Sequence, residues 1–370
     1  MKAERTVYLV RHGHPDIPLG ERWCLGHTDL PLAPIGRMQA ALLPYVAELA
    51  GKPVFCSYLT RALETARPLC PEPLIREGLE EQDLGEWDGL SFTEIMIRWP
   101  ELYEARERNP DIWPESAETT ESVRKRMRKA VLKCLKETEG DIVVVSHKSA
   151  IASLTGERIK LNHCSVSTMT WDGENLIPSE VGRMPHPALT EEVCLSLLKA
   201  AGTPEPVCAH CCAVAKKAME LLDLLEQKER PGEGGLDCGP DFSGLNRGRL
   251  FASAMLHDIA RTEPDHAAVG AAWVKTLGYP EVAAAIARHH DLGDPAEMGA
   301  AENAAAPCPE ALSEAALLYL ADKYIQDDRE VTLEERFALS RSRCKTEEAL
   351  LAHDRRYETA KRIESLLNRS

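Results

Sequence analysis

TVYLVRHG, residues 6–13, is a short apolar run that passes directly into an arginine, a histidine and a glycine. Such runs, rich in β-branched residues and free of polar interruptions, are typical of strands that are buried on both faces. Similar runs occur at 53–57 (PVFCS) and at 141–147 (DIVVVSH). Apolar residues at helical spacing separate them, near 36–51, from residue 60 onward and over 122–140. Strands that alternate with helices predict an α/β three-layer sandwich with a mostly parallel sheet.

The alternating pattern ends in SVSTMTWDGENL, residues 165–176. This stretch predicts a β-hairpin with its turn at Asp172 and Gly173. Three prolines follow within a short distance, and they indicate a linker at 179–189. The first domain is therefore expected to span residues 1–178.

The second half of the chain, residues 190–370, has a different pattern. Strand-like runs vanish, and Ala, Leu and Glu recur at helical spacing. Two loop-like gaps, at 229–246 and 291–310, interrupt the helical segments. This second domain is therefore expected to be an all-α bundle.

Composition limits the classes of function. A length of 370 residues favours two domains, and 44% hydrophobic with 28% charged residues is typical of a soluble globular protein. A formal net charge of -15 argues against non-specific binding to nucleic acid or to a membrane surface. The apolar runs are far shorter than a membrane span, and no signal-peptide pattern opens the chain. We therefore expect a cytoplasmic protein.

Two suggestive features have plainer explanations. The twelve cysteines are scattered, which indicates free thiols in a reducing compartment, and CAHCC at 208–212 has no second cysteine pair at zinc-site spacing. The basic segment 122–136 resembles a nucleic-acid patch, but it has an apolar stripe made of Val123, Met127, Val131 and Leu135. A helix with such a stripe packs on a core and exposes its charges to solvent.

Polar side chains follow the apolar runs where the predicted strands end. They are Arg11 and His12 after the first run, Arg61 in the helix after the second, and Ser146 and His147 after the third. The carboxyl ends of parallel strands meet at one edge of an open sheet, so these residues are expected to line one pocket. In a chain short of positive charge, such a pocket predicts an anion site.

Phosphoryl transfer is the chemistry that suits these residue types. Arginine forks and imidazolium donors bind the non-bridging oxygens of a phosphate. A histidine in the same pocket can attack phosphorus and carry the group covalently. The departing alkoxide then needs a proton from a general acid.

Five motifs occur in order: RHG, GHTDLPLAPIGRMQA, SYLTRALETA, LEEQDLGEWDGL and VVVSH. Together, over residues 1 to about 180, they resemble the histidine phosphatase (phosphoglycerate-mutase-like) superfamily. The resemblance implies that His12 is the nucleophile that becomes phosphohistidine. It also implies that Arg11, Arg61 and His147 clamp the phosphoryl oxygens, and that this domain needs no cofactor.

Glu81 is the proton donor that the resemblance implies, because it aligns with the acidic motif in LEEQDLGEWDGL. The same residue would later activate water. Glu80, Asp83 and Glu86 lie in the same stretch and stay open as alternatives, since only the motif alignment prefers Glu81.

Two departures from the family pattern bear on the pocket. Pro15 stands where the family usually has threonine, which removes one hydroxyl near the phosphate. Lys148 and Ser149 replace two glycines after the second histidine. Lys148 either binds a substrate anion or is simply exposed.

Hydrolysis is the predicted outcome of the reaction. The domain is short and lacks the extra segments with which the mutases of the family enclose a bisphosphate. A phosphoglycerate-mutase-type phosphotransferase stays open as the alternative. Among the other histidines, His14 and His27 are candidates for the rim of the pocket, and His163 is given no role.

The helical half holds a second cluster of chemistry-bearing residues. In chain order they are His210, His257, Asp258, His266, His289, His290 and Asp322. Imidazole and carboxylate groups are ligands of first-row metals, and a carboxylate can bridge two ions. Packing does not explain a set of this size, so a metal site is predicted.

The order of these residues resembles the HD-domain phosphohydrolases, which are named for a His-Asp doublet, over about Thr190–Asn368. The resemblance implies metal ligands at His210, His257, Asp258, His266, His289 and Asp322, with His290 a further candidate. It implies a divalent transition metal (Fe, Mn, Zn or Ni), as two ions that share Asp258. It also places Arg261 near a substrate phosphate.

The expected protein is therefore a bifunctional phosphohydrolase. Its first domain would be a phosphomonoesterase, and its second a metal-dependent phosphohydrolase that acts on a nucleotide or related phosphoester. The expected partner is a small phosphorylated metabolite or nucleotide, with no nucleic acid and no membrane, and a homodimer stays open. The alternative is a histidine phosphatase that a non-catalytic, nucleotide-binding HD domain regulates.

Overall fold

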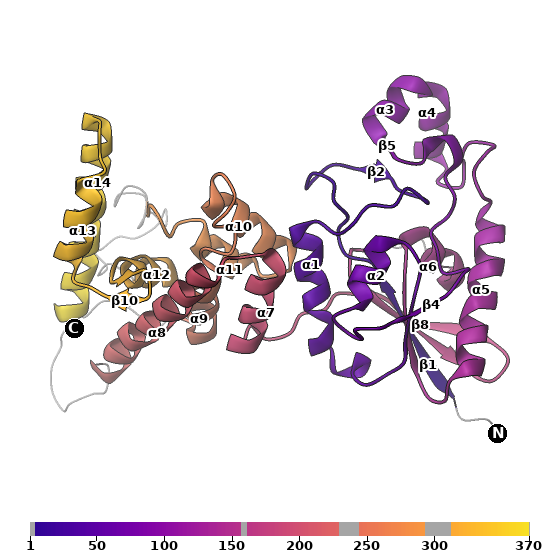
Figure 1. Ribbon diagram of the computed structural model, residues 1–370, viewed down its shortest axis with the longest axis horizontal. Helices are drawn as coiled ribbons and strands as arrows, with labels where there is room; N and C mark the ends of the chain where they lie inside the picture. The colour runs from indigo at the N-terminus through magenta and orange to yellow at the C-terminus, as the bar shows by residue number, and fades with distance from the viewer. Residues whose placement is uncertain (1–3, 157–160, 229–243, 293–311, 370) are drawn as a thin grey trace, which may run out of the picture. The chain divides into compact units, whose positions relative to one another are not determined.

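The computed structural model describes residues 4–156, 161–228, 244–292 and 312–369. The chain divides into two compact units, Met1–Pro187 and Ala188–Ser370. The first unit contains a large sheet with helices, and the second is mainly helical (Figure 1).

A six-stranded sheet forms the centre of the first unit (Figure 1). In chain order its strands are β1 (Arg5–Arg11), β3 (Val54–Cys56), β4 (Leu74–Ile75), β6 (Ile142–Ser146), β7 (Val166–Trp171) and β8 (Leu176–Arg183). In space the order is β4-β3-β6-β1-β7-β8. The first four of these strands are parallel, whereas β7 and β8 are antiparallel to their neighbours. The three apolar runs are β1, β3 and β6, so the predicted mostly parallel sheet is confirmed.

Helices cover both faces of this sheet. On one face lie α1 (Pro34–Ala41) and α2 (Thr60–Ala66), and on the other lie α5 (Thr120–Glu137) and α6 (Lys148–Thr155). Alternate residues of β6 divide between the two cores, since Val144 packs with α5 and α6 whereas Val145 packs with α1 and α2. Burial on both faces is the reason why the strands are apolar throughout. The predicted three-layer sandwich is confirmed.

The predicted hairpin is confirmed, because β7 and β8 pair antiparallel on either side of residues 172–175. β8 is longer than the sequence indicated and continues to Arg183. The linker prediction is therefore wrong over residues 179–183, which lie in the sheet. Pro178 does not stop the strand because β8 is an edge strand, where proline is tolerated.

The segment predicted as one helix at 36–51 forms three shorter pieces. α1 ends at Ala41, and two 3-10 turns follow, η1 (Leu43–Tyr45) and η2 (Ala47–Leu49). Pro44 has no N–H to donate to the residue four positions earlier, so the α-helix cannot continue through it.

The basic helix predicted near 122–140 is α5. It begins after Thr119, whose side chain accepts a hydrogen bond from the Ser122 N–H. The buried side chains of the helix include all four of the predicted stripe: Val123, Met127, Val131 and Leu135. The interpretation of α5 as a helix packed on the core is confirmed.

A small layer precedes α5 in the chain. It contains η3 (Gly85–Trp87), β5 (Leu90–Ser91), α3 (Phe92–Arg98) and α4 (Pro100–Arg108), and β5 pairs with β2 (Trp23–Cys24). These elements share an apolar cluster of their own around Cys24, Leu84, Trp87 and Ile95. The chain between Glu81 and α5 is therefore folded on a core rather than extended as a loop.

The second unit is helical, as predicted. Its helices are α7 (Glu191–Ala201), α8 (Glu205–Lys228), α9 (Arg247–Leu256), α10 (His266–Thr276), α11 (Pro280–Ile286), α12 (Glu314–Lys323), α13 (Leu333–Arg341) and α14 (Glu347–Arg369). The sequence did not predict the short ladder of β9 (Ile325–Gln326) and β10 (Arg329–Glu330). Most of the two predicted gaps, at 229–243 and 293–310, lies outside the described residues.

α8 packs against both α9 and α12, and α14 packs against α12 and α13. The residues of the predicted metal cluster lie within α8, just after α9, at the start of α10, just after α11 and near the end of α12. Among the helices in the described part of the chain, none is long and apolar enough to cross a bilayer.

Candidate functional site

The loop after β1 carries His12 to the carboxyl edge of the sheet. The His12 N–H donates to the Ser146 carbonyl of β6 (2.9 Å), and the Gly13 N–H donates to Thr65 Oγ1 of α2 (2.9 Å). Gly13 lies so close to α1 that a Cβ on it would meet the Gly36 carbonyl oxygen at 2.5 Å. The glycine of the RHG motif is therefore required for the loop to reach this position.

His12 is held as a neutral imidazole with one nitrogen available for attack. Its Nδ1 lies 2.7 Å from the Gly13 carbonyl oxygen, which can only accept, so Nδ1 carries the proton. Burial, together with Arg61 and His147, holds the pKa of His12 well below its ordinary value of 6.5. At neutral pH Nε2 therefore keeps its lone pair, which is the state that a nucleophile needs.

Hydrogen bonds within the protein also fix Arg11 and Arg61. Both Nη atoms of each guanidinium donate to fixed acceptors, which are Leu161 O (2.6 Å) and His163 Nε2 (2.9 Å) for Arg11, and Thr28 O (2.8 Å) and Gly26 O (2.7 Å) for Arg61. In both residues Nε is buried and has no hydrogen-bond partner. Burial lowers the pKa of Arg11 to about 10, so the group is still charged at neutral pH.

His147 lies next to His12, with 5.0 Å between the ring centroids, and is fully buried. Neither of its ring nitrogens has a hydrogen-bond partner. Burial and the charges of Arg61 and Arg11 hold its pKa well below 6.5. Its nitrogens and the two arginine Nε atoms are buried polar atoms without partners, on three residues near enough for the charges of Arg61 and Arg11 to act on His147. Native proteins satisfy nearly all such atoms, so this set of atoms indicates a site built for an oxyanion.

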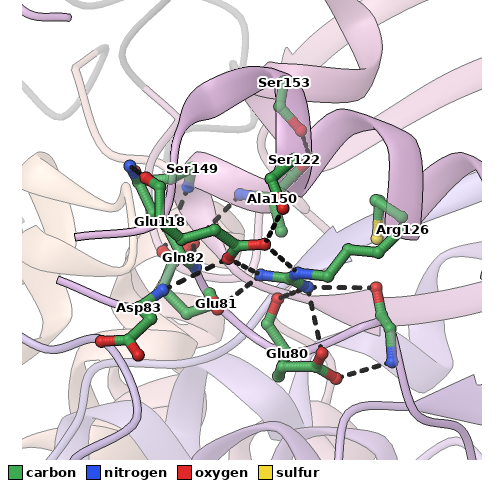
Figure 2. Close-up of polar contacts among 12 residues, drawn as sticks. Glu80, Glu81, Gln82, Asp83, Glu118, Ser122, Arg126, Ser149, Ala150 and Ser153 are labelled. Carbon is green, nitrogen blue, oxygen red and sulfur yellow. Dashed lines mark hydrogen bonds and ion pairs between the residues drawn. The ribbon is translucent and has the colours of Figure 1, made fainter. Parts of the chain in front are cut away.

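Glu81 lies beside the helix that begins directly after His147. Its carboxylate accepts from the N–H groups of Ser149 (3.1 Å) and Ala150 (3.0 Å) in the first turn of α6, and from that of Gln82 (2.9 Å) (Figure 2). These three donors fix the carboxyl group at the end of β6 and the start of α6.

The three alternative acids have other surroundings. Glu80 pairs with Arg126 on α5, at 3.3 Å. Asp83 and Glu86 are exposed. Of the four, Glu81 is the one whose carboxylate binds the start of α6. Its role as proton donor stays a prediction.

The predicted rim residues lie around the pocket. Lys148 is the first residue of α6 and is exposed. His27 Nε2 lies 3.0 Å from the Glu81 carbonyl oxygen, and His14 is buried with its N–H bound to Gln39 Oε1 at 2.9 Å. Lys148 directly follows His147, His27 contacts the Glu81 main chain, and the His14 ring lies 5.0 Å from that of His163. Their roles toward a substrate stay predictions.

His163 lies beside Arg11 and His12, and the sequence did not identify it as a site residue. Its Nε2 accepts from Arg11 Nη2 at 2.9 Å, and its ring centroid is 5.6 Å from that of His12. His163 precedes β7, which runs antiparallel to β1. An antiparallel strand begins at the edge where its neighbour ends, so the predicted hairpin was the available signal.

The second unit brings the predicted metal ligands together around Asp258. In each of two groups the ligand atoms lie within 4.8 Å of one another: His210, His257 and Asp322, and Asp258, His266, His289 and His290. Asp258 also reaches the first group, because its Oδ2 is 3.8 Å from His257 Nε2. Its Oδ1 is 3.2 Å from His266 Nε2 and 3.6 Å from His289 Nε2. All six predicted ligands therefore converge, and His290 lies with them.

Main-chain carbonyls orient three of the histidines. Nδ1 of His257, just after α9, lies 2.8 Å from the carbonyl oxygen three residues earlier. Nδ1 of His289, just after α11, lies 2.6 Å from the carbonyl oxygen three residues earlier. Nδ1 of His210 on α8 lies 2.7 Å from the Asp327 carbonyl oxygen, between β9 and β10. Each ring therefore directs Nε2 at the cluster, as metal-binding histidines do.

The cluster fits a divalent cation. His257 Nε2, His289 Nε2 and Asp258 Oδ1 are buried and have no hydrogen-bond partner. Burial lowers the pKa of His257 to about 4 and that of His290 to about 3. Burial raises the pKa of Asp258, but the adjacent His289, His257 and Arg261 outweigh it, so the pKa lies below 3.8. Neutral imidazoles and ionised carboxylates are the forms that bind metal.

Two cationic residues flank the cluster. Arg261 Nε lies 3.5 Å from Asp258 Oδ2, and its role toward a substrate phosphate stays a prediction. Lys323, which the sequence did not single out, donates from Nζ to Asp322 Oδ2 at 2.5 Å. Its position directly after Asp322 was the only signal. Within the described residues, the cysteines of CAHCC belong to neither ligand group.

Comparison with known proteins matches both halves of the chain. The family model of the histidine phosphatase superfamily (branch 1) matches residues 7–177, and that of the HD domain matches residues 207–327. A bifunctional protein of Mycobacterium tuberculosis is 32% identical over 155 residues, which are 40% of this chain and 42% of that protein. The chain therefore matches less than half the length of this curated relative.

A second relative is covered more fully. Glucosyl-3-phosphoglycerate phosphatase of Mycobacterium tuberculosis is 30% identical over 178 residues, which are 44% of this chain and 78% of that protein. Among solved structures, Bacillus stearothermophilus YhfR is 25% identical with a TM-score of 0.45, covering 48% of this chain and 97% of that one. The ordered motifs of the first unit and the His-Asp cluster of the second coincide with the two matched segments. The chain thus belongs to the histidine phosphatase superfamily through residues 7–177 and carries an HD domain at residues 207–327.

Proposed function

We propose that this chain is a bifunctional phosphohydrolase whose first unit removes the phosphoryl group of a small phosphomonoester through a phosphohistidine at His12. One observation carries the proposal. Buried nitrogens without partners belong to Arg11, Arg61 and His147, which all act on the neutral imidazole of His12, and the His147 ring lies 5.0 Å from it. The non-bridging oxygens of a phosphoryl group would supply the acceptors that these donors lack.

The proposed reaction has two steps. His12 Nε2 attacks phosphorus, the bond from phosphorus to the ester oxygen breaks, and Glu81 gives its proton to that oxygen. Water then attacks the phosphohistidine, Glu81 takes a proton from it, and phosphate leaves from a regenerated imidazole. Arg11, Arg61 and His147 stabilise the charge on the phosphoryl oxygens in both steps.

Hydrolysis is favoured over transfer by what two relatives are called. They are a glucosyl-3-phosphoglycerate phosphatase and the 6-phosphofructo-2-kinase/fructose-2,6-bisphosphatase of Caenorhabditis elegans. A phosphoglycerate mutase-like protein of Arabidopsis thaliana, 34% identical over 162 residues, keeps phosphotransfer as the alternative. Incubation with phosphoglycerates separates the two: a phosphatase releases inorganic phosphate, whereas a mutase equilibrates the isomers without releasing it.

For the second unit we propose a metal-dependent phosphohydrolase that acts on a nucleotide or related phosphoester. His210, His257 and Asp322 would hold one ion, His266 and His289 with His290 a second, and Asp258 would contact both. Fe, Mn, Zn and Ni are the candidates, because imidazole and carboxylate ligands suit them. Such ions, when bound, activate water and neutralise charge on a phosphoester. Arg261, at the edge of the cluster, would hold the substrate phosphate.

The proposed partner is thus a small phosphorylated metabolite or a nucleotide. The cytoplasm is the proposed location, which the unpaired state of the cysteines in the described part of the chain supports. Thiols stay reduced in that compartment.

The test is a screen of phosphomonoesters and nucleotides, with and without divalent metal, against the wild type, His12→Ala and Asp258→Ala. Loss of the nucleophile is expected to lower phosphomonoesterase activity by about 10³-fold or more and to spare the metal-dependent activity. Asp258→Ala is expected to lower the metal-dependent activity and to spare the phosphomonoesterase activity. Activities that both variants retain at the wild-type level would contradict the proposal. Nucleotide-induced thermal stabilisation without turnover would favour the alternative, in which the HD domain only regulates.

A further inference from the structure

Arg126 differs from the other cations of α5. The remaining arginines and lysines of this helix are exposed, as expected for a solvated face, whereas Arg126 is partly buried. All five of its N–H donors have acceptors: Gly78 O (3.2 Å), Glu80 O (2.8 Å), Glu81 O (2.7 Å), and the two carboxylate oxygens of Glu118 (2.8 Å each) (Figure 2). A guanidinium has five such donors, so none is left for solvent or ligand.

Two of these hydrogen bonds hold the peptide groups on either side of the Glu81 Cα. Nη1 donates to the carbonyl oxygen of Glu80, and Nη2 donates to that of Glu81. Because peptide groups are planar, their orientations set the φ and ψ angles of Glu81. They therefore also set the direction in which the Glu81 side chain leaves the backbone. One guanidinium fixes the point from which the carboxyl group reaches α6.

Glu118 holds Arg126 in this position. Its two carboxylate oxygens accept from Nε and Nη2, which is the bidentate geometry that makes arginine–carboxylate pairs strong. The Glu118 backbone is tied to the same loop, since its N–H donates to Asp83 O (2.9 Å) and its carbonyl accepts from Gln82 Nε2 (2.6 Å). Arg126 and Glu118 thus enclose the loop that carries Glu81 from two sides.

We propose that Arg126, held by Glu118, is a positioning residue for Glu81 in the phosphomonoesterase reaction. The inference rests on the proposed function, in which Glu81 gives a proton to the leaving oxygen. Loss of the hydrogen bonds from the Arg126 guanidinium would let the loop at residues 80–82 shift, and the Glu81 carboxyl group would move away from that oxygen. It would leave the contacts of Arg11 and Arg61 intact. Proton transfer would suffer, and phosphate binding would not.

Two esters with different leaving groups separate this effect from general damage. p-Nitrophenyl phosphate releases a stabilised phenolate that needs no proton, whereas glycerol phosphate releases an alkoxide that does. Arg126→Lys keeps the charge but cannot form the fork. We expect kcat/KM for glycerol phosphate, which reports the steps up to release of the alcohol, to fall about tenfold or more, since small displacements of a catalytic group are costly. We expect kcat/KM for the nitrophenyl ester to stay within about twofold of the wild type, because its leaving group needs no proton and phosphate binding is unchanged. Hydrolysis of the phosphohistidine is common to both esters and also uses Glu81, so a fall in kcat wherever that step is slow is expected for both.

Lys125→Met is the matched control, because it removes an exposed cation from the neighbouring position of α5. It should change neither activity. Glu118→Gln weakens the fork at nearly constant volume and should give a smaller loss with the same selectivity for glycerol phosphate. The thermal midpoint of each variant reports whether it folds, and Glu118→Gln carries the test if Arg126→Lys does not.

A double variant with Glu81→Gln tests whether Arg126 acts through Glu81. If Arg126 acts through Glu81, then adding Arg126→Lys to Glu81→Gln costs little more, because residues that act together are not additive. Equal losses of kcat/KM on both esters, no loss on either, or a full additional loss in the Glu81→Gln background would overturn the inference. If the wild type hydrolyses neither ester, or His12→Ala hydrolyses them equally well, the proposed function itself fails.

Discussion

Arg61 shows how single residues prepare the pocket. Both of its Nη atoms donate to main-chain carbonyls, and the buried Nε has no partner of its own. The carbonyls that it binds, Gly26 and Thr28, belong to a loop whose N–H groups donate to the Asp88 carboxylate. The guanidinium is therefore fixed before any substrate arrives, and such preorganisation is what stabilises a developing charge.

We expect Arg61→Lys to lower kcat/KM for phosphomonoesters by about 10²- to 10³-fold, as for the loss of one preorganised donor. Lysine carries its donors on one nitrogen at the end of a flexible stem, so it cannot match the fixed spacing with which the guanidinium reaches two carbonyls and an oxyanion. Steady-state kinetics on the substrate found in the screen measures the effect. Arg67→Lys, at an exposed position just after the same helix, is the control. An Arg61→Lys enzyme within twofold of the wild type would show that this guanidinium does not contact the phosphoryl group.

At the scale of elements, the contact between the loop after β1 and α1 depends on two glycines. A Cβ on Gly36 would lie 2.0 Å from the His14 carbonyl oxygen, and a Cβ on Gly13 would meet Gly36 in turn. Both obstacles are main-chain atoms, which cannot move as a side chain end can. The position of the nucleophile is thus set by a backbone-to-backbone approach.

We predict that Gly36→Ala destabilises the first unit by about 2 kcal/mol or more, as overpacking against the backbone does. Denaturant unfolding of the full chain measures this change. Gly248→Ala, near the start of α9, serves as control, because its Cβ would make only an ordinary contact at 3.4 Å. That control should be neutral or slightly stabilising, since alanine favours helix over glycine. A Gly36→Ala protein as stable as the wild type would contradict the close approach.

The pairing of α5 with Glu118 also predicts a dependence of stability on pH. Burial raises the pKa of Glu118, but hydrogen bonds from Arg126 and Ser122 outweigh it, so the folded-state pKa lies below the ordinary 4.5. As the pH falls from 4.5 through the folded value, the unfolded chain binds a proton that the folded chain does not, and stability is lost. Glu118→Gln should flatten the fall of the unfolding free energy over this range. Glu115→Gln, an exposed neighbour, should not, and equal curves for both variants would refute the argument.

The apolar runs that form strands were the most informative feature of the sequence for the site of the first unit. Arg11, His12 and His147 were predictable because each directly follows an apolar run, and the parallel order of those runs brings their ends together. His163 was missed because its strand runs the other way. Arg126 was missed because nothing in the sequence separates it from the other cations of α5. Arg126 is less exposed than those cations because it contacts the loop that carries Glu81, and this loop is distant from α5 in the sequence.

The metal cluster was predictable for a different reason. Seven ligand-type residues in a helical context are rare, whatever their packing. Their division into two groups was predicted only from the resemblance, since the direction of each ring depends on tertiary contacts such as that of His210 with Asp327. The extension of β8 into the predicted linker is not visible in the sequence, because proline usually ends a strand and is tolerated in one only at a sheet edge.

At the scale of the whole molecule, each unit has its own core and its own site. The first unit has no metal-ligand group among the described residues, whereas the second has two. A ligand that binds only the native form of one unit stabilises that unit alone.

Calorimetry of the full chain should therefore show a transition that a divalent metal shifts upward and a chelator shifts back. At a metal concentration of about 100 times Kd the shift corresponds to roughly 2.7 kcal/mol. Asp258→Ala should abolish the shift, and Asp223→Asn, at an exposed carboxylate of α8, should preserve it. Elemental analysis of the protein should give two ions per chain. A single ion, or a shift that survives Asp258→Ala, would contradict the proposed sharing of Asp258.

The histidines just beyond α9 and α11 share a local geometry with a practical consequence. Each ring of His257 and His289 is oriented by a carbonyl of its own preceding turn, three residues back, rather than by a distant partner. A four-residue segment at a helix end thus contains both the histidine that offers Nε2 to a metal and the carbonyl oxygen that orients its ring. If this segment is placed at the end of an unrelated designed helix, the histidine should point Nε2 in the same direction relative to the helix axis. A designer of metal sites would then need to choose only the relative placement of two such helix ends.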